Sequence, residues 1–201
     1  MSAFLAPPRA PFAFVAADVP TAIAAAMRGV SWSAEDPRCP PLAELAYLRV
    51  GHLDFDGRPC VGELIVARPL VAATRALFGR LWALGFPLRS LRLIDEFGGS
   101  DDASMAADNS SAFNFRTIAG TARLSQHALG RAVDLNPLEN PWLAGGGVQP
   151  AAGAAYLDRR HVRPGMIVRP GPVTAALDEL GWEWGGDWPQ ADYHHVMQPR
   201  A

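Results

Sequence analysis

Residues Ser125 to Trp142 read SQHALGRAVDLNPLENPW, a stretch that places a histidine and an aspartate shortly before two Asn-Pro turns. Asp134 stands among Ala132, Val133 and Leu135, a pattern typical of a buried strand. Burying an unpaired carboxylate costs roughly several kcal/mol of folding free energy. We therefore expect a positively charged partner next to Asp134.

The composition indicates one domain of mixed structure. The chain has 201 residues, of which 49% are hydrophobic, so it is long enough to bury a core without disulfides. We divide it into residues 1–41, an N-terminal helix and Pro-rich connector packed on the domain, and residues 42–201, the main domain. Cys39 and Cys60 would form a disulfide in an oxidising compartment, and the sequence leaves that open.

Charge and residue usage exclude several classes of function. The net charge is -2 and no basic block is interleaved with aromatics, so we expect no nucleic-acid partner. The chain contains no lysine, which excludes Schiff-base chemistry and a phosphate-binding P-loop lysine. No apolar run reaches the ~18 residues of a membrane span. Residues 1–20 lack the basic region of a signal peptide.

Proline at helix starts and glycine just past helix ends predict three helices. They run from Pro20 to Gly29, from Pro69 to Leu84, and from Pro172 to Gly181. In the second helix the apolar positions recur at helical spacing, at Leu70, Thr74, Leu77, Leu81 and Leu84.

Strands and loops follow from the remaining patterns. Residues 45–55 and 61–67 are strand-like and flank Asp56-Gly57, which predicts a hairpin. Residues 88–97 are expected to form a strand. Residues 98–114 and 145–153 are rich in small and polar residues, which predicts loops.

The histidines supply candidate metal ligands. His127 and Asp134 are separated by small residues that would let a metal approach, and histidine nitrogen and carboxylate oxygen are zinc ligands. A catalytic zinc needs a third ligand, which we expect from Asp187–His195, where His194 and His195 are both candidates. The other two histidines are interpreted as structural, and they are His52 and His161.

Asp192 is the expected general base of such a site, because a hydrolytic zinc site needs a carboxylate near the water that it deprotonates. The alternative interpretation is that residues 193–195 form a polar edge strand without a metal and that Asp192 is a solvated turn residue. That interpretation would make the chain an ordinary α+β interaction domain.

The two segments together resemble a known family. The motif SxHxxGxAxDxN, followed by WGGDW and DxxH, is similar to the zinc D-alanyl-D-alanine carboxypeptidase and L-alanyl-D-glutamate endopeptidase family, relatives of the vancomycin-resistance peptidases. The segments LIDEFGGSDDASMAADNSSAFNFR, NPLENPW, YLDRR and GWEWGG resemble the extracellular peptidoglycan-peptidase-like branch of that family. The resemblance covers roughly residues 42–197, so that residues 42–201 would be a zinc peptidase domain.

The resemblance implies one zinc ion per chain with three ligands, His127, Asp134 and His195. It implies Asp192 as the catalytic base. Strand alternation alone would place His194 on the same face as Asp192, so the family pattern requires a bulge or turn there. Val196 departs from the aromatic residue that relatives often have.

Two further residues are expected near the substrate. Arg116 would bind a substrate carboxylate or the oxyanion of the tetrahedral intermediate, and its alternative is a surface ion pair. Ser125 resembles the family serine beside the first ligand and would bind substrate or support that ligand.

The resemblance thus implies a zinc peptidase that acts on the stem peptides of bacterial peptidoglycan, in the periplasm or cell envelope. It leaves open whether a terminal residue is removed or an internal bond is cut, and the oligomeric state. A non-catalytic zinc-containing binding module, as in hedgehog domains, is the alternative. The expected fold is α+β, a small central antiparallel sheet flanked by helices as in hedgehog and D-Ala-D-Ala peptidases.

Overall fold

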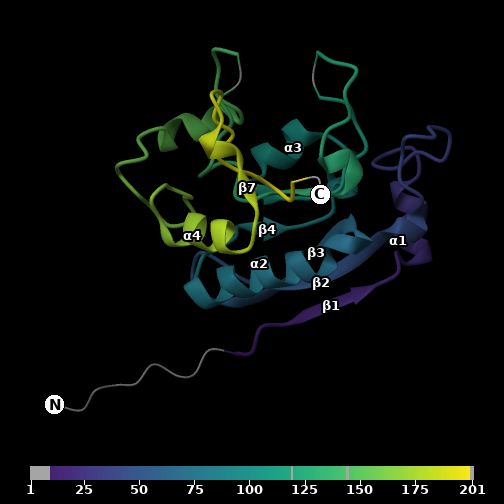
Figure 1. The fold of residues 1–201 in the computed structure, drawn as a ribbon, viewed down its shortest axis with the longest axis horizontal. Helices are drawn as coiled ribbons and strands as arrows, with labels where there is room; N and C mark the ends of the chain where they lie inside the picture. The colour runs from purple at the N-terminus through teal and green to yellow at the C-terminus, as the bar shows by residue number, and fades with distance from the viewer. Residues whose placement is uncertain (1–9, 119, 144, 200–201) are drawn as a thin grey trace.

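The computed structural model describes residues 10–118, 120–143 and 145–199. They form a mixture of short helices and small sheets (Figure 1). The strands are β1 Phe14–Ala17, β2 Leu45–Leu53, β3 Pro59–Ala67, β4 Ser90–Leu91, β5 Asn109–Ser110, β6 Ala132–Asp134, β7 Glu183–Trp184 and β8 His195–Met197. The α-helices are α1 Thr21–Met27, α2 Val71–Leu84, α3 Asp101–Ala106 and α4 Pro172–Glu179. Short 3₁₀ helices cover Leu42–Glu44, Arg68–Leu70, Ile94–Phe97, His127–Leu129, Ala151–Tyr156 and Gly185–Asp187.

The mixed content and the antiparallel sheets confirm the coarse prediction of an α+β protein. The strands form three small sheets where one central sheet was expected, with the orders β1-β2-β3, β4-β5 and β6-β8-β7. The pair β4-β5 is parallel, and the other two sheets are antiparallel. Part of the N-terminal stretch in which no signal peptide was predicted, residues 1–9, lies outside the described residues.

The predicted hairpin forms the largest sheet. Strands β2 and β3 pair from Leu45↔Ala67 to Leu53↔Pro59. Gly57 turns the chain with a φ of 77°, a left-handed conformation that glycine adopts without steric cost. The Asp54 carboxylate accepts hydrogen bonds from the backbone N–H groups of Asp56 and Arg58, which fixes the turn.

Helix α2 packs on this sheet and is the longest helix that was predicted. It ends at Leu84 and is capped by Gly85, which has a φ of 71°. The side chains that it buries are Thr74, Leu77, Phe78, Leu81 and Trp82. Leu84 was expected on this face but is 43% exposed, because it lies in the last turn where the chain leaves the helix.

Three predictions for the middle of the chain need correction. The strand expected over 88–97 is reduced to β4, and Ile94–Phe97 forms a 3₁₀ helix. The loop expected over 98–114 contains α3, because the Ser100 side chain accepts a hydrogen bond from Ala103 N–H and caps the helix. The loop expected over 145–153 passes into the 3₁₀ helix Ala151–Tyr156.

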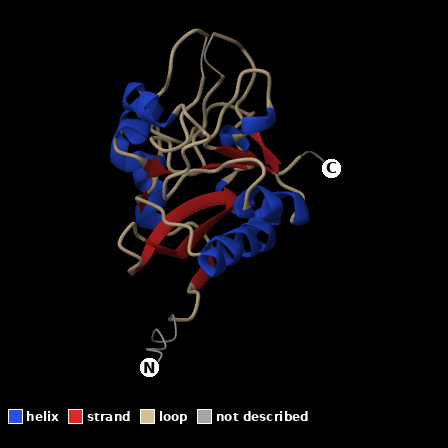
Figure 2. Ribbon diagram, turned by 90° about the vertical axis from the view of Figure 1, so that its left-hand side faces the viewer, coloured by secondary structure: helices blue, strands red, loops and turns tan. Residues whose placement is uncertain are grey.

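The C-terminal half brings distant segments together. Strand β8 lies between β6 and β7, so residues 132–134 and 195–197 become neighbours. Figure 2 shows these short strands above the β2-β3 hairpin, with the loops above them. Val133, Leu177 and Val196 join the core that also contains the buried side of α2. Burying each such side chain contributes roughly 1.5–3 kcal/mol of folding free energy.

Among the described residues, every helix is too short or too polar to cross a membrane.

Candidate metal centre

Two local structures present the candidate ligands. His127 begins a 3₁₀ turn that ends at Gly130, and Asp134 is the last residue of β6. Asp134 stands directly opposite His195 in the β6-β8 pair. Residues opposite each other in an antiparallel pair have side chains on the same face, so these two meet across the sheet.

Gly130 joins this turn to the main sheet. Its φ is 65°, and a Cβ atom at this position would lie 2.4 Å from the backbone nitrogen of Ala67. Its carbonyl oxygen accepts a hydrogen bond of 2.9 Å from Ala67 N–H at the end of β3. The glycine of the motif is therefore required both by the turn and by the close approach of two backbones.

The three candidate ligand atoms form a nearly equilateral triangle. His127 Nε2 lies 3.1 Å from His195 Nδ1 and 3.2 Å from Asp134 Oδ1. His195 Nδ1 also lies 3.2 Å from Asp134 Oδ1. Atoms that bind one zinc ion tetrahedrally lie about 3.3–3.6 Å from one another. The spacing fits a small divalent cation, and these residues could hold a metal ion.

Neighbouring groups orient His127 for this task. Its Nδ1 atom lies 2.6 Å from the carbonyl oxygen of Ala112, an acceptor that requires a proton on Nδ1. In the neutral ring Nε2 then carries the lone pair that faces the triangle. Fixing a histidine tautomer through its other nitrogen is how proteins prepare a metal ligand.

Neighbouring histidines compensate the negative charge of the buried Asp134. Burial by itself raises the pKa of this carboxyl, but His127 and His194 outweigh it and hold the pKa well below its usual range. Burial lowers the pKa of His127, yet Asp134 has the larger total effect and raises it. The expected positive partners of Asp134 are therefore histidines.

Asp192 and His194 lie beside the triangle. His195 N–H lies 3.3 Å from the carbonyl oxygen of Asp192, so the chain turns between these residues and does not alternate as a regular strand. His194 Nε2 lies 3.0 Å from Asp192 Oδ1 and 3.9 Å from Asp134 Oδ1. His194 is not among the three residues whose ligand atoms cluster, and its Nδ1 lies 2.9 Å from Asn140 O.

Comparison with known families finds one similarity, and it covers the segment that contains the candidate ligands. Residues 119–197 match the family model described as D-alanyl-D-alanine carboxypeptidase. This segment is similar to that family, and residues 1–118 lie outside the match. No curated protein and no solved structure matches the chain.

The carboxypeptidase-family match contains the triangle and Asp192 but not Arg116. Arg116 forms an ion pair with Asp101, the first residue of α3, and each side chain is about one third exposed. Ser125 is buried, and its hydroxyl oxygen accepts a hydrogen bond of 3.2 Å from His127 N–H. In this structure Ser125 supports the turn that carries the first candidate ligand.

Sequence reasoning missed two residues at the edge of the candidate metal centre. Asp101 was part of a predicted loop, and its pairing with Arg116 had no local signal. Trp188 is 37% exposed, and its ring centroid lies 5.2 Å from that of His195. The WGGDW motif contains this tryptophan, which was the available signal.

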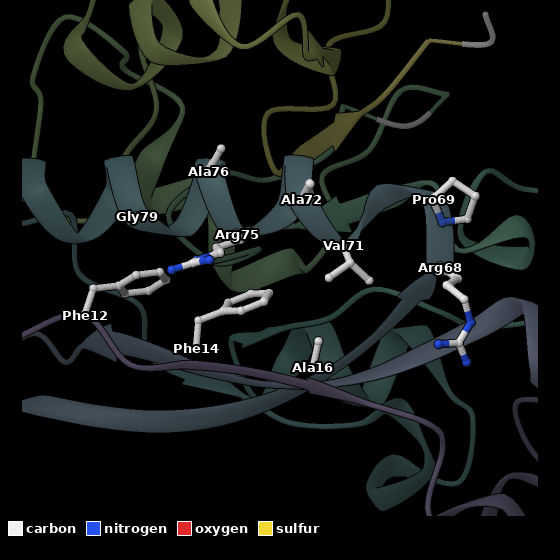
Figure 3. A pocket seen from close by; sticks show the side chains of 10 residues that line it. All are labelled: Phe12, Phe14, Ala16, Arg68, Pro69, Val71, Ala72, Arg75, Ala76 and Gly79. Atoms are coloured by element: carbon white, nitrogen blue, oxygen red, sulfur yellow. The ribbon is translucent and has the colours of Figure 1, made fainter.

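The other histidines, the cysteines and the surface groove lie outside the candidate metal centre. His52 and His161 are not part of the cluster that could hold a metal. Cys39 and Cys60 are both free. A groove of about 890 Å³ lies between β1 and α2 (Figure 3). Its lining includes Phe12, Phe14 and Arg75 and none of the predicted site residues.

Proposed function

We propose that this protein is a zinc-dependent peptidase that hydrolyses an amide bond in the stem peptides of bacterial peptidoglycan. The observation that carries the proposal is the triangle of His127, Asp134 and His195, with Asp192 beside it. In the sequence, His195 follows His127 by 68 residues and Asp134 by 61 residues. The family match over residues 119–197 supports a cell-wall peptide as substrate.

The proposed metal ligands are His127, Asp134 and His195. Two histidines and one carboxylate leave a coordination position open, which is typical of catalytic zinc sites. A zinc ion bound there would supply Lewis acidity and bring the pKa of a water molecule toward ~7.

The protein side chains have separate roles in the proposed reaction. Asp192 takes a proton from the attacking water molecule and later delivers it to the nitrogen of the leaving amine, so that the C–N bond breaks without a free amide anion. Arg116 donates hydrogen bonds to the oxygen of the attacked carbonyl group as negative charge develops on it. His194 holds Asp192 in place. Because the substrate is part of the cell wall, we place the enzyme in the periplasm or cell envelope.

The test replaces Asp192 by asparagine, which keeps the size of the side chain and removes the base. Asp192→Asn should abolish hydrolysis of a defined muropeptide, followed by mass spectrometry, while elemental analysis still finds about one zinc per chain. Asp187→Asn removes the same charge five residues earlier and should keep most of the activity. Loss of zinc from Asp192→Asn would contradict these roles.

A native protein that retains zinc but hydrolyses no muropeptide would instead support a non-catalytic binding module. Purified protein that contains no zinc would remove both interpretations.

A further inference from the structure

We propose that this peptidase cuts an internal peptide bond and does not read a free terminal carboxylate next to that bond. The inference rests on the proposed function and narrows its substrate to peptides with further residues on both sides of the cut. It follows from the ion pair between Arg116 and Asp101.

Asp101 is held in place independently of Arg116. Its Oδ1 atom accepts a hydrogen bond of 3.0 Å from the side-chain amide of Asn114, and its Oδ2 atom contacts Arg116 Nε. Asn114 is only 4% exposed and also donates to the carbonyl oxygen of Gly99. Both oxygens of the carboxylate are thus engaged, so Asp101 is a fixed anion beside Arg116.

Arg116 is tied to the metal centre by its backbone neighbours. Its carbonyl oxygen accepts a hydrogen bond of 3.1 Å from Ser125 N–H, and Ser125 in turn supports His127. Asn114 N–H donates to the carbonyl oxygen of His127. These backbone hydrogen bonds hold Arg116 next to the turn that carries His127.

An enzyme that removes a terminal residue must recognise the free carboxylate of that residue. Proteins do this with an arginine whose positive charge and paired guanidinium N–H donors are available to the ligand. Here Asp101 already neutralises Arg116, and a second carboxylate would be repelled by the first. The neutral carbonyl group of an internal peptide bond meets no such repulsion, and the remaining guanidinium N–H groups of Arg116 can donate to it.

The test compares two stem peptides of identical sequence, one with a free C-terminal carboxylate and one with a C-terminal amide. We expect the native zinc enzyme to cut both at the same internal bond, with kcat/KM values that agree within about threefold. A preference of about tenfold or more for the free acid would overturn the inference, whichever arginine causes it.

A variant tests the role of Asp101 directly. Asp101→Asn keeps an acceptor for Asn114 and releases the charge of Arg116, so the preference for the free acid should rise about tenfold. Asp102→Asn removes the same charge from the same helical turn and should leave the ratio unchanged. An unchanged ratio in Asp101→Asn would overturn the inference, provided that its zinc content and melting temperature match those of the native protein.

Binding provides a readout that does not depend on turnover. In an Asp192→Asn background, calorimetry should find similar Kd values for the acid and the amide, and tighter binding of the acid once Asp101 is also replaced. Tighter binding of the acid with Asp101 intact would overturn the inference. If neither peptide binds or is hydrolysed, both the proposed function and this inference are wrong. Hydrolysis of only the peptide with a free C-terminal carboxylate contradicts this inference but not the proposed function.

Discussion

His194 Nε2 lies 3.0 Å from Asp192 Oδ1, and Nδ1 of the same ring lies 2.9 Å from Asn140 O. The ring thus lies between a carbonyl oxygen and a carboxylate, and the carboxylate favours the protonated form of the ring. Burial lowers the pKa of His194, but Asp192 and then Asp134 outweigh it and raise the pKa to about 9. His194 therefore links the proposed base to the loop that contains Asn140.

Two substitutions of His194 distinguish its contact with Asp192 from its contact with Asn140. Gln places an amide nitrogen close to the position of Nε2 and can still donate to Asp192, whereas Asn can replace only Nδ1. We expect His194→Asn to lower kcat on the order of tenfold to a hundredfold, because a misplaced base loses its alignment, and His194→Gln to lose less. Both variants should bind about one zinc per chain in elemental analysis. Loss of zinc from both would identify His194 as a ligand.

Zinc affinity should decrease as the pH falls. His127 must lose its proton to bind a metal, and its raised pKa means that protons compete more strongly than at a free histidine, whose pKa is 6.5. A chelator competition series between about pH 6 and 8 measures this competition. The exposed His161 provides the control, since His161→Asn should leave the curve unchanged. An affinity that does not depend on pH would contradict the assignment of His127.

Gly130 should be far less replaceable than Gly98. Both have nearly the same left-handed φ, 65° and 63°, but only Gly130 has a backbone atom in the space of a Cβ. Gly98→Ala should cost about 1–2 kcal/mol of unfolding free energy. Gly130→Ala should cost clearly more in urea denaturation and should also weaken zinc binding, because the turn that carries His127 must shift. Equal losses in the two variants would show that the contact with Ala67 is unimportant.

The buried Glu139 should make stability depend on pH. Burial, together with a hydrogen bond and the charge from Asp108, raises its pKa from 4.5 to about 7. The folded state then holds a proton that the unfolded state releases, so this contribution to stability is fully present below about pH 4.5 and is lost as the pH rises through about 7.

Denaturation of Glu139→Gln across this range should give a flatter dependence of the unfolding free energy on pH. Glu179→Gln, at an exposed residue paired with Arg80, is the control. Identical slopes for Glu139→Gln and the native protein would contradict the raised pKa.

The sequence predicted the elements that depend on local chemistry. Asp56-Gly57 specified the hairpin, and Pro69 and Gly85 delimited α2 to within two residues. The motif around His127 and Asp134 and the family resemblance predicted that these two side chains would meet His195, and the structure brings the three together. Their role as metal ligands remains a prediction.

The features that were not predicted depend on tertiary contacts, or on a helix-capping residue within a segment whose composition also suits a loop. Helix α3 lies in a segment whose Gly, Ser and Asp residues also suit a loop, and only the Ser100 cap decides between them. The division into three sheets depends on which backbones pair, which side-chain pattern does not specify in two- and three-residue strands. The Asp101–Arg116 pair joins residues whose proximity only the folded chain creates.

We propose that His127, Asp134 and His195 bind one divalent metal ion. Crystals of the zinc-loaded protein, with anomalous diffraction recorded on both sides of the zinc absorption edge, locate that ion without reference to activity. We expect one peak that appears only above the edge, within bonding distance of His127 Nε2, Asp134 Oδ1 and His195 Nδ1. A zinc peak on His194 and Asp192 instead, or fully zinc-loaded crystals with no peak at these three atoms, would contradict it.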